Sequence, residues 1–221
     1  MIKKIELDLS SICNLSRIPI NILNNPIREA ACSNNVFQTL TNYYENIAYK
    51  NLNDLYKTNI SKLNNLSHTT IFLPWYHKKP VLDFKDHAFI TKMNKENIRK
   101  KEIKIINILN SIKENDYVPE KFVDRKLGYV TGYFLKNKEN KKFYVVSGNH
   151  RVAILHSLGY KKIPVIIEST NFFKSRDKVE FGYENMPEFI LRSSVNHWPS
   201  VLSNFLTEKE ALEIFDSFIG V

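Results

Sequence analysis

Hydrophobic residues recur with two different periods along this chain, and the changes of period predict an α+β fold. Residues 94–114 repeat apolar side chains at helical spacing, which predicts an amphipathic helix with lysines on its opposite face. Residues 128–135 and 142–146 instead predict strands, and the polar turn at residues 137–140 joins them as a hairpin. The apolar positions of the helix are Ile98, Ile105, Ile108, Leu109 and Ile112, and the lysines are Lys100, Lys101, Lys104 and Lys113.

The hairpin leads into a strand, a turn, a helix and another strand. Residues 143–167 read FYVVSGNHRVAILHSLGYKKIPVII. We expect the turn at residues 147–149, a helix at 150–158 that stops at Gly159, and a strand at 163–167.

The N-terminal part of the chain gives weaker signals. Residues 2–9 alternate apolar and polar side chains and predict a short strand, after which Pro19 and Pro26 indicate a loop. Residues 36–56 predict one or two helices whose aromatic stripe packs in the core. Prolines at positions 74 and 80 oppose a long helix in residues 67–89, so we expect a short strand and an ordered loop there.

The C-terminal part is loop-rich beyond Glu168 as far as residues 186–192. A last helix is predicted at residues 207–219, where Thr207 and Glu210 form a capping box and Gly220 provides the stop. Since the chain has no internal repeat and no low-complexity linker, one compact domain is expected. It would comprise an N-terminal extension packed on the core (residues 1–92), the core itself (93–168) and a C-terminal helical extension (169–221).

The turn Ser147-Gly148-Asn149-His150-Arg151 carries the strongest candidate chemistry. A helix N-terminus presents unpaired backbone N–H groups and a partial positive charge, so it stabilises an anion. Gly148 allows a sharp turn and close approach to a ligand, and Ser147 or Asn149 can cap the helix or bond a phosphate oxygen. His150 can donate to a phosphate or shuttle a proton, and Arg151 offers a bidentate fork for phosphate oxygens.

An ordinary helix start is the alternative interpretation of this turn. Asn149 would then cap the helix, and His150 and Arg151 would be exposed residues of its first turn. Cations are mildly unfavourable at a helix N-terminus. Two such side chains are therefore easier to explain if the turn binds an anion.

Phosphoryl transfer also needs a carboxylate near the acceptor hydroxyl and usually Mg²⁺. Glu120, in the Pro-Glu step after the long helix, is the candidate for this catalytic role beside His150. For each carboxylate a solvated surface position is the alternative. The other candidates are Glu6, Asp8, Glu29 and Asp124.

Two aromatic segments are candidate walls of a substrate site. Trp75 and His77 follow a proline in a loop that could pack over a polar ligand. Arg192, His197 and Trp198 lie close together in sequence around a proline turn. The favoured alternative is that both tryptophans anchor their segments to the core.

Composition limits the classes of partner. The net charge of +9 favours anionic partners such as nucleotides, phosphorylated substrates or nucleic acid. Cys13 and Cys32 fit reduced thiols, and acidic residues interrupt any signal-peptide core after the first lysines. No apolar run approaches a membrane-spanning length. A cytoplasmic protein without membrane contact is therefore expected.

The order of these segments resembles the core of the ParB/sulfiredoxin superfamily. Its counterparts here are the helix IINILNSIKEND, the strand-forming YVPEKF, the hairpin ending FYVVSGNHRVAILHSLGY and the segment KKIPVII, within residues 101–168. The resemblance implies a mixed sheet with packed helices. The catalytic cysteine of sulfiredoxins would fall at Asn149, so their redox chemistry is not implied.

Other branches of that superfamily bind nucleotides. ParB proteins bind CTP through a comparable turn and read DNA through a following helix-turn-helix, which the residues after Glu168 do not clearly contain. Free-serine kinases hold nucleotide phosphates with an acid-Gly-His-His-Arg turn. This chain matches it at Gly148, His150 and Arg151, whereas Ser147 replaces the acid.

These observations together predict a nucleotide-dependent small-molecule phosphotransferase. Its donor would be ATP, ADP or CTP, accompanied by Mg²⁺, and its acceptor a hydroxylated small molecule. A nucleic-acid-associated protein, either a nucleotide-gated DNA clamp or nuclease-like, is one alternative. A non-catalytic nucleotide sensor is another.

Overall fold

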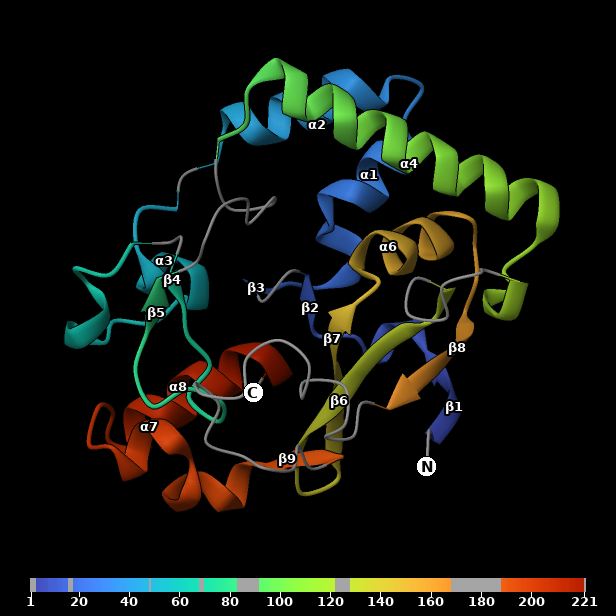
Figure 1. Ribbon diagram of the computed structural model, residues 1–221. Coiled ribbons are helices and arrows are strands. Elements are labelled where there is room, and N and C mark those ends of the chain that lie inside the picture. Colours follow the sequence, from blue (N-terminus) through green and yellow to red (C-terminus); the bar gives the residue numbers. More distant parts are fainter. Residues whose placement is uncertain are drawn as a thin grey trace.

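The fold is α+β, as the sequence predicts, and it is built around a five-stranded mixed sheet. The computed structural model describes residues 3–15, 18–47, 49–67, 70–82, 92–121, 128–167 and 188–220 (Figure 1). The strands of the sheet are β1 (Lys3–Asp8), β6 (Val130–Asn137), β7 (Asn140–Ser147), β8 (Lys162–Ile167) and β9 (Phe189–Leu191).

Strand β6 is the centre of this sheet. It pairs with β7 as an antiparallel hairpin on one edge. On its other edge it runs parallel to β8 near its start and parallel to β9 near its end. Strand β1 then pairs antiparallel with β8. Both terminal extensions therefore contribute a strand to the sheet of the predicted core.

Successive side chains of the β6–β7 hairpin point to opposite faces of the sheet, and aromatic residues from the two strands pair on each face. Tyr133 and Tyr144 stack on one face with ring centroids 5.0 Å apart, and Phe134 meets Phe143 on the other face at 5.2 Å. The register shifts at Gly132, where a side chain would overlap the carbonyl oxygen of Tyr144. Glycine is therefore required at this bulge.

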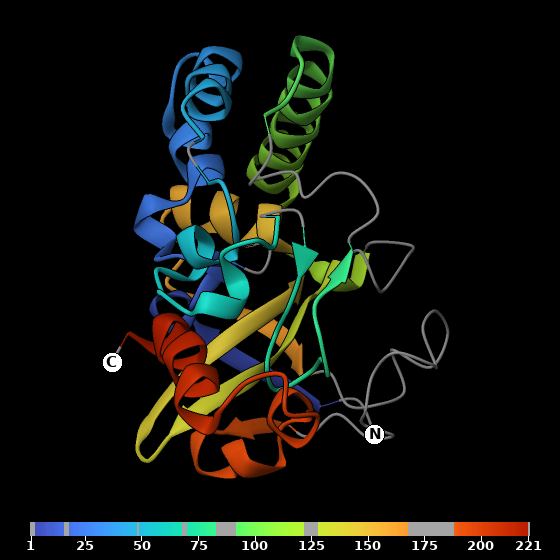
Figure 2. The same ribbon diagram turned by 90° about the vertical axis from the view of Figure 1, so that its left-hand side faces the viewer.

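Four helices gather toward one end of the molecule, and α4 runs alongside α2 and α6 (Figures 1 and 2). Polar contacts link them: the Arg99 guanidinium of α4 lies 3.5 Å from the Phe37 ring of α2, and Arg28 Nε of α1 donates to His156 Nδ1 of α6 at 2.9 Å. The helices are α1 (Pro26–Cys32), α2 (Val36–Glu45), α4 (Lys95–Asn115) and α6 (Asn149–Ser157).

The opposite end of the molecule is held by an aromatic cluster that we define as Trp75, Tyr144, Trp198, Phe215 and Phe218. Tyr144 belongs to β7, and Phe215 and Phe218 belong to the last helix, so the cluster joins the sheet to the C-terminal part of the chain. The C-terminal elements are the 3-10 helix η6 (Arg192–His197), α7 (Pro199–Leu202) and α8 (Glu208–Ile219), and the elements from the N-terminal extension are α3 (Leu52–Tyr56), β4 (Thr70–Ile71) and β5 (Val81–Leu82).

Short elements complete the described part of the chain. They are the strands β2 (Asn14–Leu15) and β3 (Ile18–Pro19) and the 3-10 helices η1 (Leu9–Ser11), η2 (Ile22–Asn24), η3 (Ser61–Leu63) and η4 (Pro119–Lys121). Within these described ranges, no helix is both long and apolar enough to cross a membrane.

Most sequence-based element predictions are confirmed. They include the first strand, the long helix, the hairpin, α6 with its flanking strands, the two helices within residues 36–56, and the last helix with its Thr207–Glu210 capping box.

Several predictions about single elements are wrong. Pro19 and Pro26 do not lie in a loop: Pro19 ends the short strand β3, and Pro26 is the first residue of α1, where its missing N–H costs nothing. The segment beginning at Tyr117 was expected to form a strand, but its residues Pro119–Lys121 form the 3-10 helix η4. Lys101 does not lie on the exposed face of α4, because its residue surface is 8% exposed.

Candidate functional site

The turn after β7 has a backbone that requires glycine. Gly148 adopts a left-handed conformation with φ of 97°, and a Cβ there would lie 3.0 Å from Val130 Cγ2 and 3.1 Å from Val130 Cα. Helix α6 then begins at Asn149 without a side-chain cap. The expectation that Ser147 or Asn149 caps the helix is therefore wrong, because the N-cap position is taken by Gly148, which has no side chain to cap with.

His150 faces inward from the first turn of α6. Its Nε2 atom is shielded from solvent, so the alternative that His150 is an exposed residue is wrong. Burial is the main cause that lowers the pKa of His150 to about 3, and the charges of Lys101, Lys104 and Arg151 contribute to the same shift. The imidazole is consequently neutral at physiological pH.

Arg151 is half-buried and points toward the segment before β6. Its Nη1 donates to the backbone carbonyl of Tyr129 at 3.1 Å. Burial lowers the pKa of Arg151, and the neighbouring Tyr117 opposes that effect. Among the residues that the structure describes, no carboxylate forms an ion pair with Arg151. A half-buried guanidinium that donates to a neutral carbonyl is a favourable place for an anion.

Two lysines of α4 belong to the same electropositive region. Lys101 is buried with its Nζ 6.0 Å from the Tyr44 ring, and Lys104 is exposed; both lie close enough to His150 to lower its pKa. Sequence reasoning missed Lys101. The available signal was its spacing, because it lies three residues after Ile98 and four before Ile105 on the buried stripe of α4.

Glu120 is connected to Arg151 through Tyr129. The Tyr129 hydroxyl donates to Glu120 Oε1, while Lys4 Nζ donates to the Tyr129 Oη at 2.7 Å and lies 3.7 Å from Glu120 Oε1. The hydrogen bond from Tyr129 is the main cause that lowers the pKa of Glu120. The Glu120 side chain is 57% exposed, which leaves it accessible to a ligand.

The other candidate carboxylates lie elsewhere. Glu6, Asp8 and Glu29 are exposed, and the Asp8 carboxylate accepts the backbone N–H of Ser10 at 2.9 Å. These three therefore fit the alternative of solvated surface groups. Asp124 lies outside the described residues.

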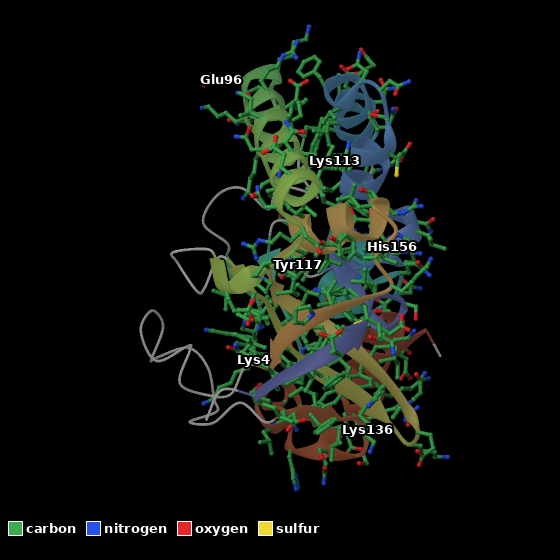
Figure 3. The ribbon with its side chains drawn as sticks, turned by 90° about the vertical axis from the view of Figure 1, so that its right-hand side faces the viewer. Lys4, Glu96, Lys113, Tyr117, Lys136 and His156 are labelled. Atoms are coloured by element: carbon green, nitrogen blue, oxygen red, sulfur yellow. The ribbon has the colours of Figure 1, made fainter. Side chains whose placement is uncertain are left out.

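A cavity of about 210 Å³ opens between the C-terminal half of α4 and Arg151. Figure 3 shows Tyr117 at the end of α4, between that helix and Lys4 of β1. The described residues that line the cavity are Asn107, Ile108, Ser111, Ile112, Tyr117 and Arg151.

The predicted substrate residues do not gather at this cavity. Trp75 and Trp198 are buried together with ring centroids 5.8 Å apart, and Trp75 Nε1 donates to Tyr133 Oη at 3.0 Å. His77 is buried, and its Nδ1 accepts the backbone N–H of Leu73 at 2.9 Å. These contacts support the alternative of core anchoring.

The remaining two residues lie near the C-terminal helices. Arg192 forms a bidentate pair with Asp216, with Nε–Oδ1 and Nη2–Oδ2 distances of 2.8 Å. His197 is exposed at the end of η6. The 3-10 helix η6, which carries both residues, leads into α7 at the end of the molecule opposite to the α2–α4 helices (Figures 1 and 2).

The described part of the chain contains no group of three or more His, Cys, Asp or Glu residues arranged to hold a metal ion. Cys13 is buried and Cys32 exposed, and both are free thiols.

Comparison with known proteins gives no relative: no protein-family model, no curated protein and no solved structure matches this chain.

Proposed function

We propose that this protein is a nucleotide-dependent small-molecule phosphotransferase that holds nucleotide phosphates at the N-terminus of α6. The observation that carries the proposal is that Arg151 and Glu120, from distant segments, both bond to Tyr129. Tyr129 thus connects a phosphate-binding cation, which bonds its carbonyl, to an accessible carboxylate, which bonds its hydroxyl. Phosphoryl transfer requires such a pair near the donor phosphate and the acceptor hydroxyl.

The phosphates would be bound by fixed positive groups. Arg151 uses Nη1 for the Tyr129 carbonyl, and its guanidinium has further N–H donors for phosphate oxygens. Lys101 and Lys104 add positive charge from α4, and the uncapped start of α6 adds the helix dipole. The turn resembles that of the nucleotide-binding branches of the ParB/sulfiredoxin superfamily, which supports the same assignment.

Glu120 is the proposed proton acceptor. The acceptor hydroxyl loses its proton to the carboxylate, its oxygen forms a bond to the terminal phosphorus, and the bond from that phosphorus to the rest of the nucleotide breaks. A triphosphate donor would leave as the diphosphate. Glu120 is a weak base because its pKa is lowered, but catalysis of this reaction depends mainly on positioning and on charge stabilisation.

His150 takes a supporting role in this proposal. A pKa of about 3 makes it a poor proton shuttle at neutral pH. Its neutral imidazole has Nε2 shielded from solvent, and we assign it no step in the transfer.

Mg²⁺ in such enzymes is commonly held by phosphates and water with one or two carboxylates. The described residues fit this kind of site better than a dedicated protein cage. The ion would neutralise phosphate charge when it is bound.

The test is nucleotide binding and turnover by the full chain. ATP, ADP and CTP are titrated separately by calorimetry, and release of nucleotide product is followed with a panel of hydroxylated metabolites. Arg151→Gln should weaken binding about ten- to a hundredfold, because it removes a charge-assisted hydrogen bond to phosphate. Lys100→Gln is the matched control, since Lys100 is exposed and pairs with Glu96 on the same helix as Lys101.

Absence of nucleotide binding by the wild type would refute the proposal. Nucleotide binding without turnover would favour the sensor. Salt-sensitive DNA binding would favour the nucleic-acid-associated alternative, for which the net charge of +9 is the supporting observation.

A further inference from the structure

We propose that the cavity between α4, Tyr117 and Arg151 binds the acceptor of the phosphotransfer, and that this acceptor is a small, mainly apolar alcohol. The inference rests on the proposed function, because it assigns the second substrate of that same site. It commits to a chemical class that the sequence does not identify.

The cavity has apolar walls with a fixed shape. Ile112 and Tyr117 are buried, and Ile108 packs partly against the core. The Tyr117 hydroxyl donates to the carbonyl of Gly128 at 3.0 Å, so the hydroxyl is already used and the ring is held in place. These walls favour a carbon skeleton over a hydrated ligand.

Three polar residues also line the cavity. Ser111 and Asn107 project from α4, and Arg151 lies at the α6 side. Burial raises the pKa of Tyr117 to about 12; the charge of Arg151 opposes this rise, and the charge of Glu120 adds to it. Arg151 lines the cavity directly, and Tyr129 connects it to Glu120, the other member of the proposed reaction pair, as an acceptor site requires.

The size of the cavity limits the ligand. A volume of about 210 Å³ corresponds to about seven water molecules at ~30 Å³ each. A sugar of that size would carry several hydroxyl groups, and the walls formed by Ile108, Ile112 and Tyr117 would leave most of them without hydrogen-bond partners. An alcohol with one hydroxyl group directed toward Arg151 and Glu120 avoids that penalty.

Methyl NMR can test this assignment directly. The full chain is labelled at the isoleucine δ1 methyl groups and titrated with 3-methyl-1-butanol and, separately, with glycerol. The Ile108 and Ile112 signals should shift saturably with 3-methyl-1-butanol, with an affinity at least tenfold higher than for glycerol. Saturable binding should persist in the presence of saturating ATP, because donor and acceptor must bind together.

Substitutions on α4 provide the controls. Ile108→Trp fills the cavity and should abolish the saturable shift at Ile112. Ile103→Trp places the same side chain on an exposed position of α4 and should leave alcohol binding unchanged. The Ile108→Trp protein is checked for an unchanged nucleotide affinity, which shows that it is folded.

Each outcome separates the two proposals. Three results would overturn the acceptor assignment in a protein that binds nucleotide. They are the absence of a saturable shift at Ile108 and Ile112, an equal affinity for glycerol, and displacement of the alcohol by ATP. Saturable alcohol binding together with no binding of any nucleotide would overturn the proposed phosphotransferase and leave an alcohol-binding cavity.

Discussion

Trp75 and Trp198 of the aromatic cluster and the region around Arg151 were both predicted as parts of a site, but their surroundings in the structure differ. Trp75 and Trp198 are buried against each other, and the indole N–H of Trp75 is hydrogen-bonded within the protein. Arg151, in contrast, borders a cavity and bonds a neutral carbonyl. The bulky aromatic residues near prolines therefore belong to the packed core. Arg151, which follows the turn at Gly148, lines a cavity instead.

The largest effect should come from truncating the aromatic cluster. Trp75→Ala should lower the free energy of unfolding by about 3–5 kcal/mol, because it leaves a large cavity in the core. Urea unfolding followed by circular dichroism measures the change. Leu202→Ala on the exposed surface of α7 is the control and should change stability by less than about 0.5 kcal/mol. A Trp75→Ala protein as stable as this control would remove the contrast between the two regions.

A pH effect of intermediate size should come from His150. Its folded pKa is about 3, below the unfolded value of 6.5, so the unfolded state binds more protons between these values. Stability is therefore fully present above pH 6.5 and falls by up to about 1.4 kcal/mol for each pH unit between 6.5 and 3, which amounts to a loss of about 2 kcal/mol at pH 5. His150→Gln should flatten this dependence.

Unfolding at a series of pH values tests this effect. The His156 pKa is also lowered by burial and contributes in the same direction, so wild type and His150→Gln are compared at each pH. Equal slopes for the two proteins would show that His150 is accessible to protonation in the folded state.

The smallest effect is expected at Arg192. Arg192→Gln breaks the bidentate pair with Asp216, but both side chains are partly exposed, so the loss should be below about 1 kcal/mol. Nucleotide affinity, measured by calorimetry, should not change. A loss of affinity comparable to that of Arg151→Gln would mean that the C-terminal end of the molecule belongs to the binding site.

Local patterns in the sequence were sufficient for the elements and for part of the site. The helical spacing of α4, the β-rich hairpin and the Thr207–Glu210 capping box each depend on nearby residues, so each was predictable. The same holds for Gly148, whose positive φ fits a strand-to-helix turn.

Long-range relations were not predictable in this way. Pairing of β1 with β8 and of β9 with β6 joins distant segments, and nothing in either short strand specifies its partner. Tyr129 links Arg151 to Glu120 through its carbonyl and its hydroxyl, and neither bond follows from sequence spacing. The burial of Lys101 could have been inferred from spacing, but its charge favoured an exposed position.

Strand β9 also protects the protein against self-association. It is short, and it covers the backbone of β6 from Phe134 to Lys136, beyond the point where β8 ends. If β9 detached, an apolar stretch of central strand would present unpaired N–H and C=O groups to other molecules. We therefore expect that loss of the pairing by Phe189–Leu191 would promote aggregation even while the rest of the sheet stays folded.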